Sequence, residues 1–354
     1  MTIKSSFHSS IPVVDFRDLL SSDQKKKEAF RVKIGQAMHT LGFVAVVNTD
    51  LDSERLDKTY QVAKRFFDQT LAVKEIVTSR GNSGERGFVH VESPKEGGVA
   101  ARDRKEFFHV GPEFAEKERK ERGYYANVWP EDPEFKRTIR DLYECLISYI
   151  RPLATAISTK EEDLSSLVDR GEHLLRLIHY PGKMSPKEEW AAEHTDLNFF
   201  TILPPATSKG LQIKTADGTW IDCVVPPGAL IFQAGDMLQN LTNGFYRSAP
   251  HRVVPNKEKQ DRYSVVLFAH TKNENRLDPR PHFVEKMGGV RRFPKASRKE
   301  LLEYYLTALG RASKEMKERV KNSGIIDRIA PLQNPWGQKI QEKVLKMLES
   351  SSLM

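Results

Sequence analysis

Short apolar segments follow one another from residue 174 to residue 270, and turn signals separate them. The segments read LLRLIHY, FFTIL, GLQIKT, TWIDCVV, ALIFQAG, HRVV and YSVVLFAH. The turn signals are Pro181-Gly182, Pro204-Pro205, Asp217-Gly218, Pro226-Pro227-Gly228 and Asn243-Gly244. About seven or eight short strands within ~100 residues are typical of a sandwich or a jelly roll. The chain is therefore predicted to be mainly β, with a double-stranded β-helix (jelly roll) core and helical additions.

Helical periodicity lies on both sides of this strand region. Apolar residues recur at helical spacing in the ranges 25–41, 56–71, 135–157, 298–309 and 338–348. Further short strands are expected at 11–16, 43–48 and 105–111, and Pro152 is expected to kink the third helix. The predicted organisation is an N-terminal α/β region at 1–160, a jelly-roll core at 161–275 and a C-terminal helical region at 276–354 that packs on the core.

Charge and hydropathy disfavour several classes of protein. The 56 basic residues are mixed with 48 acidic ones, so the net charge of +8 indicates a solvated surface and no nucleic-acid partner. No apolar run approaches the length of a membrane span, and the N-terminus lacks the apolar core of a signal peptide. Two cysteines, Cys145 and Cys223, make no disulfide framework, which indicates a reduced, cytoplasmic protein. These features leave the oligomeric state open.

A histidine and an aspartate stand two residues apart in the segment EHTDLNFFTIL, at His194 and Asp196. Side chains two apart in an extended segment point to the same face, so both can reach one metal ion. A third ligand is available at His251, in the later segment SAPHRVV. Two imidazoles and one carboxylate on one side of a metal, with other positions open, are typical of non-haem Fe(II) oxygenases. The three residues are therefore predicted to bind Fe(II).

Two polar residues that follow His251 are the candidates for a cosubstrate anchor. Arg262 lies eleven residues after His251 (262 − 251), and Ser264 comes two residues later. On a strand both side chains would point to the same face, into the barrel. Many cosubstrates are carboxylates, and an arginine binds a carboxylate with two hydrogen bonds at once. Arg262 and Ser264 are therefore predicted to bind an anionic cosubstrate.

Three other titratable residues are not expected to bind the metal or the cosubstrate. His270 is a rival third ligand, but it lies eight residues past Arg262 (270 − 262), after the strand has crossed the sheet. His179 should face away from the barrel because side chains alternate along a strand. Asp236 is interpreted as a turn residue.

Two further stretches are interpreted from composition and alternation. The glycine-rich range 79–98 is expected to be a mobile connection or a lid that orders when substrate binds. The basic cluster at 102–105 is expected to be a solvated face. One residue of each of the pairs Phe107-Phe108 and Phe199-Phe200 is a candidate to face the cavity.

Seven motifs occur together in an order that resembles one known family. They are EHTDLNFFTIL, GLQIK, GTW, VPPGAL, GDMLQNLTNG, SAPHRVV and RYSVVLF. In this order they resemble the isopenicillin N synthase-like branch of the 2-oxoglutarate/Fe(II)-dependent dioxygenases, over roughly residues 11–275. The family's iron ligands fall on His194, Asp196 and His251. Its cosubstrate-binding residues fall on Arg262, Ser264 and Tyr180.

The chain departs from the family pattern at two positions near the site. Ile178 stands where plant members usually carry Asn two residues before the Tyr, and Gln233 stands where they carry Asn before Ile-Gly-Asp. The range 313–337 matches no part of the pattern. These departures bear on the identity of the substrate more than on the chemistry.

The resemblance implies an enzyme that uses Fe(II), 2-oxoglutarate and O2. It would hydroxylate, desaturate or cyclise a small-molecule substrate and release succinate and CO2. Two alternatives on the same scaffold stay open: an isopenicillin N synthase-like oxidase without 2-oxoglutarate, and an aminocyclopropane carboxylate oxidase-like enzyme that uses ascorbate. An alternative of another class is a non-enzymatic jelly-roll module that binds an anionic polymer, for which salt-sensitive binding without iron-dependent turnover would be diagnostic.

Overall fold

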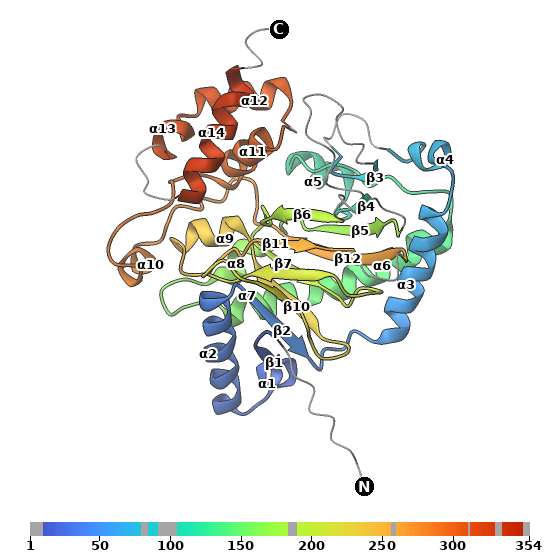
Figure 1. Ribbon diagram of the computed structural model, residues 1–354, viewed down its shortest axis with the longest axis horizontal. Coiled ribbons are helices and arrows are strands. Elements are labelled where there is room, and N and C mark those ends of the chain that lie inside the picture. Colours follow the sequence, from blue (N-terminus) through green and yellow to red (C-terminus); the bar gives the residue numbers. More distant parts are fainter. Residues whose placement is uncertain are drawn as a thin grey trace.

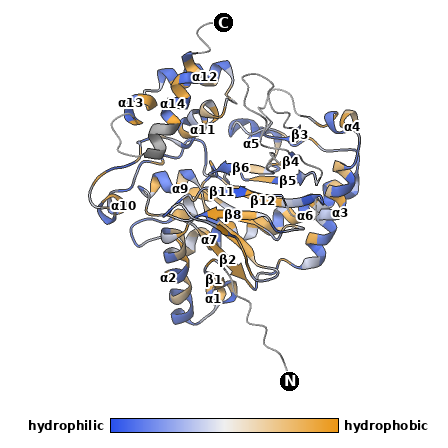
Figure 2. Cartoon of the chain, viewed as in Figure 1, coloured by the Kyte–Doolittle hydropathy of each residue, from blue (hydrophilic) through white to orange (hydrophobic). Residues whose placement is uncertain are grey.

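The computed structural model describes residues 10–78, 84–90, 105–182, 190–255, 260–310, 312–329 and 335–349. In these ranges the chain forms two β-sheets with helices on the outside (Figure 1). The strands are mostly apolar, whereas most outer helices alternate between polar and apolar residues (Figure 2). The arrangement is a jelly-roll core with helical additions, as the strand pattern predicted.

The larger sheet contains eight strands. They are β1 (Val13–Asp15), β2 (Phe43–Val47), β3 (Gly87–His90), β4 (Glu106–Val110), β5 (Leu174–Tyr180), β7 (Phe200–Leu203), β10 (Leu230–Ala234) and β12 (Arg262–Ala269). Their order is β1-β2-β10-β7-β12-β5-β4-β3, and neighbours are antiparallel except β1 and β2. Strands from the N-terminal third therefore pair directly with those of the jelly roll. The three-region division of the chain stays a prediction.

The smaller sheet contains four strands, β6 (Ala191–His194), β8 (Leu211–Lys214), β9 (Trp220–Asp222) and β11 (His251–Val253). Their order is β6-β11-β8-β9, and all pairs are antiparallel. This sheet lies against one face of the larger sheet, because Ile178 and Tyr180 of β5 share a hydrophobic cluster with Ala191 of β6 and Val253 of β11. The space between the two sheets is where the predicted site residues lie.

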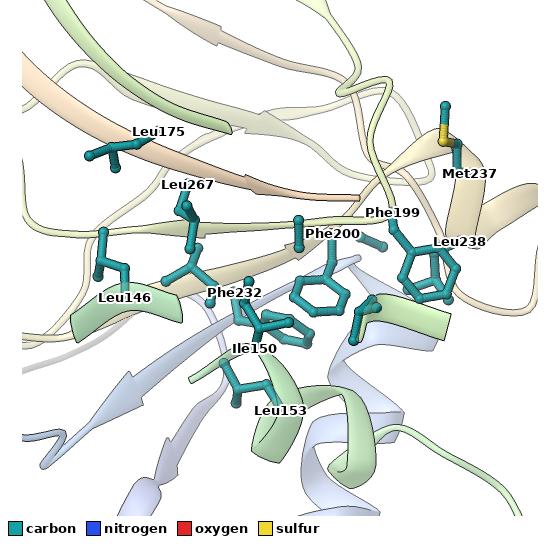
Figure 3. Close-up of a cluster of buried hydrophobic side chains, with 14 of the residues drawn as sticks. Leu146, Ile150, Leu153, Leu175, Phe199, Phe200, Phe232, Met237, Leu238 and Leu267 are labelled. Atoms are coloured by element: carbon teal, nitrogen blue, oxygen red, sulfur yellow. The ribbon is translucent and has the colours of Figure 1, made fainter. Parts of the chain in front are cut away.

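The opposite face of the larger sheet is covered by helices. The main ones are α2 (Gln24–Thr40), α3 (Ser53–Phe67), α6 (Pro133–Ser148) and α7 (Ile150–Ala156). Short helices lie in the connections between these helices and the strands, namely α1 (Phe16–Leu20), α4 (Leu71–Glu75), α5 (Glu116–Glu121), α8 (Leu164–Val168) and α9 (Asp236–Leu241). Leu146, Ile150 and Leu153 of the helices gather with Phe200 and Phe232 of the sheet (Figure 3). This contact is the main hydrophobic core.

The helix expected at 135–157 is two helices, α6 and α7, with a break at Tyr149. Pro152 explains the break, because a proline lacks the N–H that would bond to the carbonyl of residue 148 and its ring collides with that carbonyl. The helix expected at 56–71 begins earlier, at Ser53, where the side chain of Asp52 accepts from the backbone N–H of Arg55. It also ends earlier, and Leu71 begins the separate helix α4.

Five helices follow the jelly roll, α10 (Pro281–Lys286), α11 (Arg298–Ala308), α12 (Lys314–Asn322), α13 (Ile325–Ile329) and α14 (Pro335–Glu349). Helix α11 packs on α12 and α14, beside one end of the sheets (Figure 1). The charged stretch near residue 313 is helix α12, which buries Val320 and exposes most of its charges.

Residues 84–90 are the described part of the stretch 79–98. Residues 79–83 and 91–98 lie outside the described residues, as do Arg102 and Arg104 of the basic cluster. Within the stretch, residues 87–90 form strand β3, at the edge of the larger sheet, which the expectation of a loop or lid missed. In the described part of the chain, no helix has both the length and the hydropathy needed to cross a membrane.

Candidate active site

His194, Asp196 and His251 converge at one point between the sheets. His194 ends β6 and His251 begins β11, and the two residues are direct cross-strand partners. Asp196 follows β6, and one potential ligand atom from each of the three residues lies within 4.8 Å of the others. His251 Nε2 is 3.8 Å from Asp196 Oδ1. The structure therefore brings together the three residues that the sequence singled out, although β6 stops before Asp196.

Backbone carbonyls fix the orientation of both imidazoles. His194 Nδ1 is 2.7 Å from the carbonyl oxygen of Ala192, and His251 Nδ1 is 3.2 Å from that of Ala249. A carbonyl only accepts, so each Nδ1 carries the proton and donates it. Each Nε2 is then left with a lone pair, which is the form of histidine that binds metals.

The Asp196 carboxylate is held by two neighbours that sequence reasoning did not identify. Thr201 Oγ1 donates to Asp196 Oδ2 at 2.6 Å, and Gln233 Nε2 also donates to that oxygen. The other oxygen, Oδ1, is the one that faces His251. Gln233 was noted in the sequence only as a departure from a family pattern, and the structure gives it this contact.

Burial and neighbouring charges keep His194 and Asp196 in a metal-binding form. Burial, then the adjacent His251 and Lys105, lower the pKa of His194 to about 3. Burial alone would raise the pKa of Asp196, but His251, His194 and the hydrogen bond from Thr201 outweigh it and lower that pKa. At neutral pH the site therefore offers an unprotonated His194 imidazole and an ionised Asp196 carboxylate.

Arg262 lies fully inside the same cavity with part of its guanidinium unsatisfied. Its Nε donates to the carbonyl of Ser208 at 3.0 Å, and its guanidinium carbon lies 5.0 Å from the centre of the Tyr180 ring. Its Nη1 atom is buried and has no hydrogen-bond partner among the described residues. Burial lowers the pKa of Arg262. A buried, partly unsatisfied guanidinium is costly, and a carboxylate would satisfy it with a charge-assisted hydrogen bond.

Strand register places Ser264 and Tyr180 beside Arg262. Arg262 pairs with Tyr180, and Ser264 pairs with Ile178, across β12 and β5. All four residues line one cavity of about 1140 Å³ that also contains His194, Asp196 and His251. The donor set of two imidazoles and one carboxylate suits ferrous iron, and the arginine suits an anion nearby. The residues present therefore fit a metal ion with an anionic cosubstrate.

The structure also shows where the remaining candidate residues lie, and it agrees with some of their predictions and not with others. His270 also lines the cavity and is not one of the three clustered metal-ligand candidates in the described chain. His179 faces away, where it contacts Glu106 at 2.8 Å and stacks on Tyr263. Phe107 lines the cavity and Phe108 packs in the core, as alternation predicted. The second pair was predicted wrongly, since Phe199 and Phe200 both lie in the core.

The interpretation of Asp236 as a turn residue is wrong. Asp236 is the first residue of α9 and is completely buried behind the metal-binding residues. Its backbone N–H donates to the carbonyl of Asp196 at 2.8 Å, and its side chain accepts from Thr195 Oγ1 at 3.0 Å. Burial raises the pKa of Asp236 to about 7. The residue ties α9 to the loop that carries Asp196, and nothing in its local sequence indicated this.

Comparison with known proteins gives matches along most of the chain. A family model described as non-haem dioxygenase in morphine synthesis N-terminal matches residues 11–132, and one described as 2OG-Fe(II) oxygenase superfamily matches residues 171–271. The 2-oxoglutarate-dependent dioxygenase 11 of Oryza sativa subsp. japonica is 30% identical over 289 residues, which are 78% of this chain and 76% of the rice protein.

Two solved structures resemble the fold. A 2OG-Fe(II) oxygenase family protein from Caulobacter crescentus has a TM-score of 0.76 and 30% identity, covering 85% of this chain and 100% of that chain. A full-length protein of Neurospora crassa, solved in complex with alpha-KG, has a TM-score of 0.72 and 24% identity, covering 82% of this chain and 94% of that chain. At that identity the second likeness shows the fold alone.

Proposed function

Because this chain belongs to the 2-oxoglutarate/Fe(II)-dependent dioxygenase superfamily, we propose that His194, Asp196 and His251 hold its ferrous ion. The observation that carries the assignment is the convergence of these three residues within one cavity that also holds a buried arginine. The chain is an Fe(II)- and 2-oxoglutarate-dependent oxygenase. The bound iron, with 2-oxoglutarate and O2, supplies the oxidising chemistry, and the cosubstrate is released as succinate and CO2.

The protein's own groups hold the metal ligands in place before the metal arrives. The carbonyls of Ala192 and Ala249 orient the two imidazoles so that Nε2 is the available atom. Thr201 and Gln233 occupy Oδ2 of Asp196, so Oδ1 is the oxygen left for the metal. Orientation of this kind reduces the reorganisation needed for binding.

The proposed role of Arg262, Ser264 and Tyr180 is to bind the carboxylate of 2-oxoglutarate that is far from the iron. The unsatisfied Nη1 of Arg262 supports this role, because a carboxylate would satisfy it and balance the buried charge. Ser264 is buried beside it and can donate from its hydroxyl, and the Tyr180 ring lies against the guanidinium. Water would then be largely excluded from the anchored end.

The substrate is proposed to be a small molecule that is hydroxylated, desaturated or cyclised. We also propose that the chain falls in the isopenicillin N synthase-like branch, which the motif order from EHTDLNFFTIL to RYSVVLF supports. A cytoplasmic location and a role for ascorbate stay predictions.

The experiment that tests the cosubstrate site is anaerobic titration of the Fe(II)-loaded protein with 2-oxoglutarate, followed through its weak visible charge-transfer band. Replacing Arg262 by Gln should weaken 2-oxoglutarate binding by roughly tenfold to more than a hundredfold, because a charge-assisted hydrogen bond is lost. Iron binding should persist, and Arg262→Lys should recover only part of the affinity.

A parent protein without the band at millimolar 2-oxoglutarate would contradict the cosubstrate assignment. O2 consumption that needs only substrate or ascorbate would then favour the oxidases that do without 2-oxoglutarate. Unchanged 2-oxoglutarate affinity in Arg262→Gln would remove the role given to that residue.

A further inference from the structure

His179 lies between two carboxylates, on the face of the large sheet that is turned away from the cavity. Its Nδ1 is 2.8 Å from Glu106 Oε1 of β4, and its Nε2 is 3.2 Å from Asp261 Oδ2, just before β12. An ionised carboxylate only accepts, so Nδ1 carries a proton and donates it to Glu106. Nε2 is buried and makes no hydrogen bond with the described residues. Whether Nε2 also carries a proton therefore decides if His179 attracts or repels Asp261.

Both carboxylates are ionised at neutral pH. Burial alone would raise the pKa of Glu106, but hydrogen bonds from His179 and Lys74 outweigh it and lower that pKa. In the same way, the backbone N–H of Gly182 and the nearby His179 outweigh burial and lower the pKa of Asp261. Glu106 is fixed, because Lys74 Nζ donates to its Oε2 at 2.6 Å and both side chains are buried. The Asp261 side chain is 45% exposed, so it is the carboxylate that can move.

The other groups around the imidazole are paired or keep their proton. Tyr263 of β12 stacks on the ring with centres 4.8 Å apart, and burial raises the pKa of its hydroxyl. Lys74 is paired with the buried carboxylate, and Lys64 of α3 is paired with Asp68 at 2.8 Å. Histidine is the side chain whose charge ordinarily changes in the neutral range of pH. Within this cluster, the charge that depends on pH near neutrality is therefore that of His179.

The cluster lies directly behind the proposed cosubstrate anchor. Asp261 precedes Arg262, and its Oδ1 accepts from the backbone N–H of Gly182 at 2.7 Å, two residues after Tyr180. Arg262 and Tyr180 are cross-strand partners on β12 and β5, and both line the cavity. Neighbouring residues of a strand point to opposite faces. The cluster on one face therefore holds the ends of the two strands that carry the anchor on the other face.

Protonation of the ring changes the sign of one contact. In the imidazolium both N–H groups can donate, one to Glu106 and one to Asp261, and the positive charge attracts both carboxylates. Either neutral tautomer instead leaves a lone pair that faces a carboxylate oxygen. Because Asp261 is the carboxylate that can move, the start of β12 is drawn toward β5 in the charged state and released in the neutral state.

We propose that His179 is a positioning residue that makes 2-oxoglutarate binding depend on pH, because it holds Asp261, and with it Arg262, close to β5. The inference rests on the proposed function, in which Arg262 and Tyr180 bind the far carboxylate of 2-oxoglutarate. Binding is tightest while His179 is charged and weakens as pH rises. By linkage, 2-oxoglutarate binding then takes up protons at His179, because the coupling between two ligands is reciprocal.

The test is anaerobic titration of the Fe(II)-loaded protein with 2-oxoglutarate at about pH 6 and at about pH 8.5. His179→Asn keeps an amide N–H that can donate to Glu106 in place of Nδ1, and it removes Nε2. The measured quantity is the ratio of the two Kd values. This ratio should be at least about fivefold larger in the parent than in His179→Asn, in which the contact with Asp261 is absent at both pH values.

Asp261→Asn tests the other side of the contact, at a half-exposed side chain whose replacement leaves the core intact. Its amide oxygen can still accept from Gly182, and its amide nitrogen can donate to the neutral Nε2 of His179. This variant should bind 2-oxoglutarate tightly at the higher pH and lose most of the pH dependence. His39→Asn is the matched control, because His39 Nδ1 donates to the carbonyl of Phe245 and the ring stacks on Phe245, away from the described cavity lining. It should keep the ratio of the parent.

Proton uptake gives a second measurement, which a merely structural role would not change. Calorimetry of 2-oxoglutarate binding in two buffers of different ionisation enthalpy counts the protons that are taken up. The parent should take up more protons for each bound 2-oxoglutarate than His179→Asn or Asp261→Asn.

Three results would overturn the role of His179 while the parent binds 2-oxoglutarate. They are equal Kd ratios in the parent and His179→Asn, equal proton uptake in the parent and both cluster variants, and a loss of pH dependence in His39→Asn as large as in His179→Asn. A parent that binds no 2-oxoglutarate at either pH would instead overturn the proposed cosubstrate site.

Discussion

At the scale of single residues, the orientation of the Asp196 carboxylate depends on Gln233 and Thr201. Gln233→Leu removes one donor from Oδ2 and leaves a buried carboxylate partly unsatisfied. Loss of such a supporting hydrogen bond should weaken metal binding by about tenfold to a hundredfold. Titration of the metal-free protein with Fe(II) or Co(II) measures the change.

The control for that change is Gln212→Leu. Gln212 lies on β8 and bonds to Asp222 and Arg252, and it does not line the described cavity. Its replacement should leave metal affinity unchanged. Equal metal affinity in Gln233→Leu and the parent would show that Thr201 alone orients the carboxylate.

Asp236 gives the free energy of unfolding a specific pH dependence. Its pKa is raised in the folded protein to about 7 from an ordinary value of 3.8. The folded state then holds a proton that the unfolded state has released, so stability falls as pH rises from about 4 to about 7. Asp236→Asn removes this penalty while its amide oxygen can still accept from Thr195. The variant should gain on the order of a few kcal/mol relative to the parent between pH 4 and pH 8.

Urea unfolding of the metal-free protein at both pH values measures this difference for parent and variant. Asp222→Asn provides a comparison, because Asp222 is exposed at the end of β9. Its effect on stability should be small. A stability difference between Asp236→Asn and the parent that does not change with pH would contradict the raised pKa.

At the scale of elements, helix α11, whose residues Leu302, Tyr305 and Leu306 line the cavity, begins at a well-defined cap. Ser297 and Glu300 form a capping box, in which each side chain bonds to the other residue's backbone N–H. Ser297→Ala should lower the free energy of unfolding by about 1 kcal/mol, because one orphan N–H of the helix loses its partner. Urea unfolding measures it, with Ser166→Ala as the control, since Ser166 is exposed and bonds only to a backbone carbonyl at the start of its own helix. Equal losses in both variants would argue against the cap.

The elements also show where sequence reasoning succeeds and where it stops. The helix expected at 25–41 ends at Thr40, and Gly42, which follows it, adopts a positive φ of 78° between α2 and β2. The sequence did not reveal that the backbone carbonyl of Arg247 lies where a Cβ at this position would stand. Local conformation follows from residue type, whereas a close approach between segments two hundred residues apart depends on the packed fold.

At the scale of the whole molecule, metal and cosubstrate should stabilise the fold through the three proposed ligands. A ligand at a hundred times its Kd adds about 2.7 kcal/mol to the free energy of unfolding. Parent protein should therefore melt at a higher temperature with Fe(II) and 2-oxoglutarate under anaerobic conditions. His194→Ala should fold but show no such shift.

His282→Ala is the control for that experiment, because His282 lies on α10 and bonds to Thr159, outside the described cavity lining. It should respond to the ligands like the parent. A full thermal shift in His194→Ala would show that the ligand assignment is wrong.

In the site too, residue spacing predicted some of the arrangement, whereas other contacts depend on the packed fold. The spacing of His194, Asp196 and His251 predicted that they lie together, and their potential ligand atoms do lie within 4.8 Å. Alternation along β12 predicted that Arg262 and Ser264 share a face. Gln233 and Thr201 could not be found in this way, because their contacts with Asp196 depend on how the segment after β6 folds against β7 and β10.

The two halves of the site stand on different sheets. His194 and His251 belong to the small sheet, and Arg262 and Tyr180 belong to the large one. A cosubstrate that reaches from the metal to Arg262 would therefore link the small sheet to the large sheet. Without it, the two sheets meet mainly through apolar side chains. The two sheets should move relative to one another while the site is empty and become more rigid when the cosubstrate is bound. The enzyme would then owe the rigidity of its active site to a molecule that it consumes in every turnover.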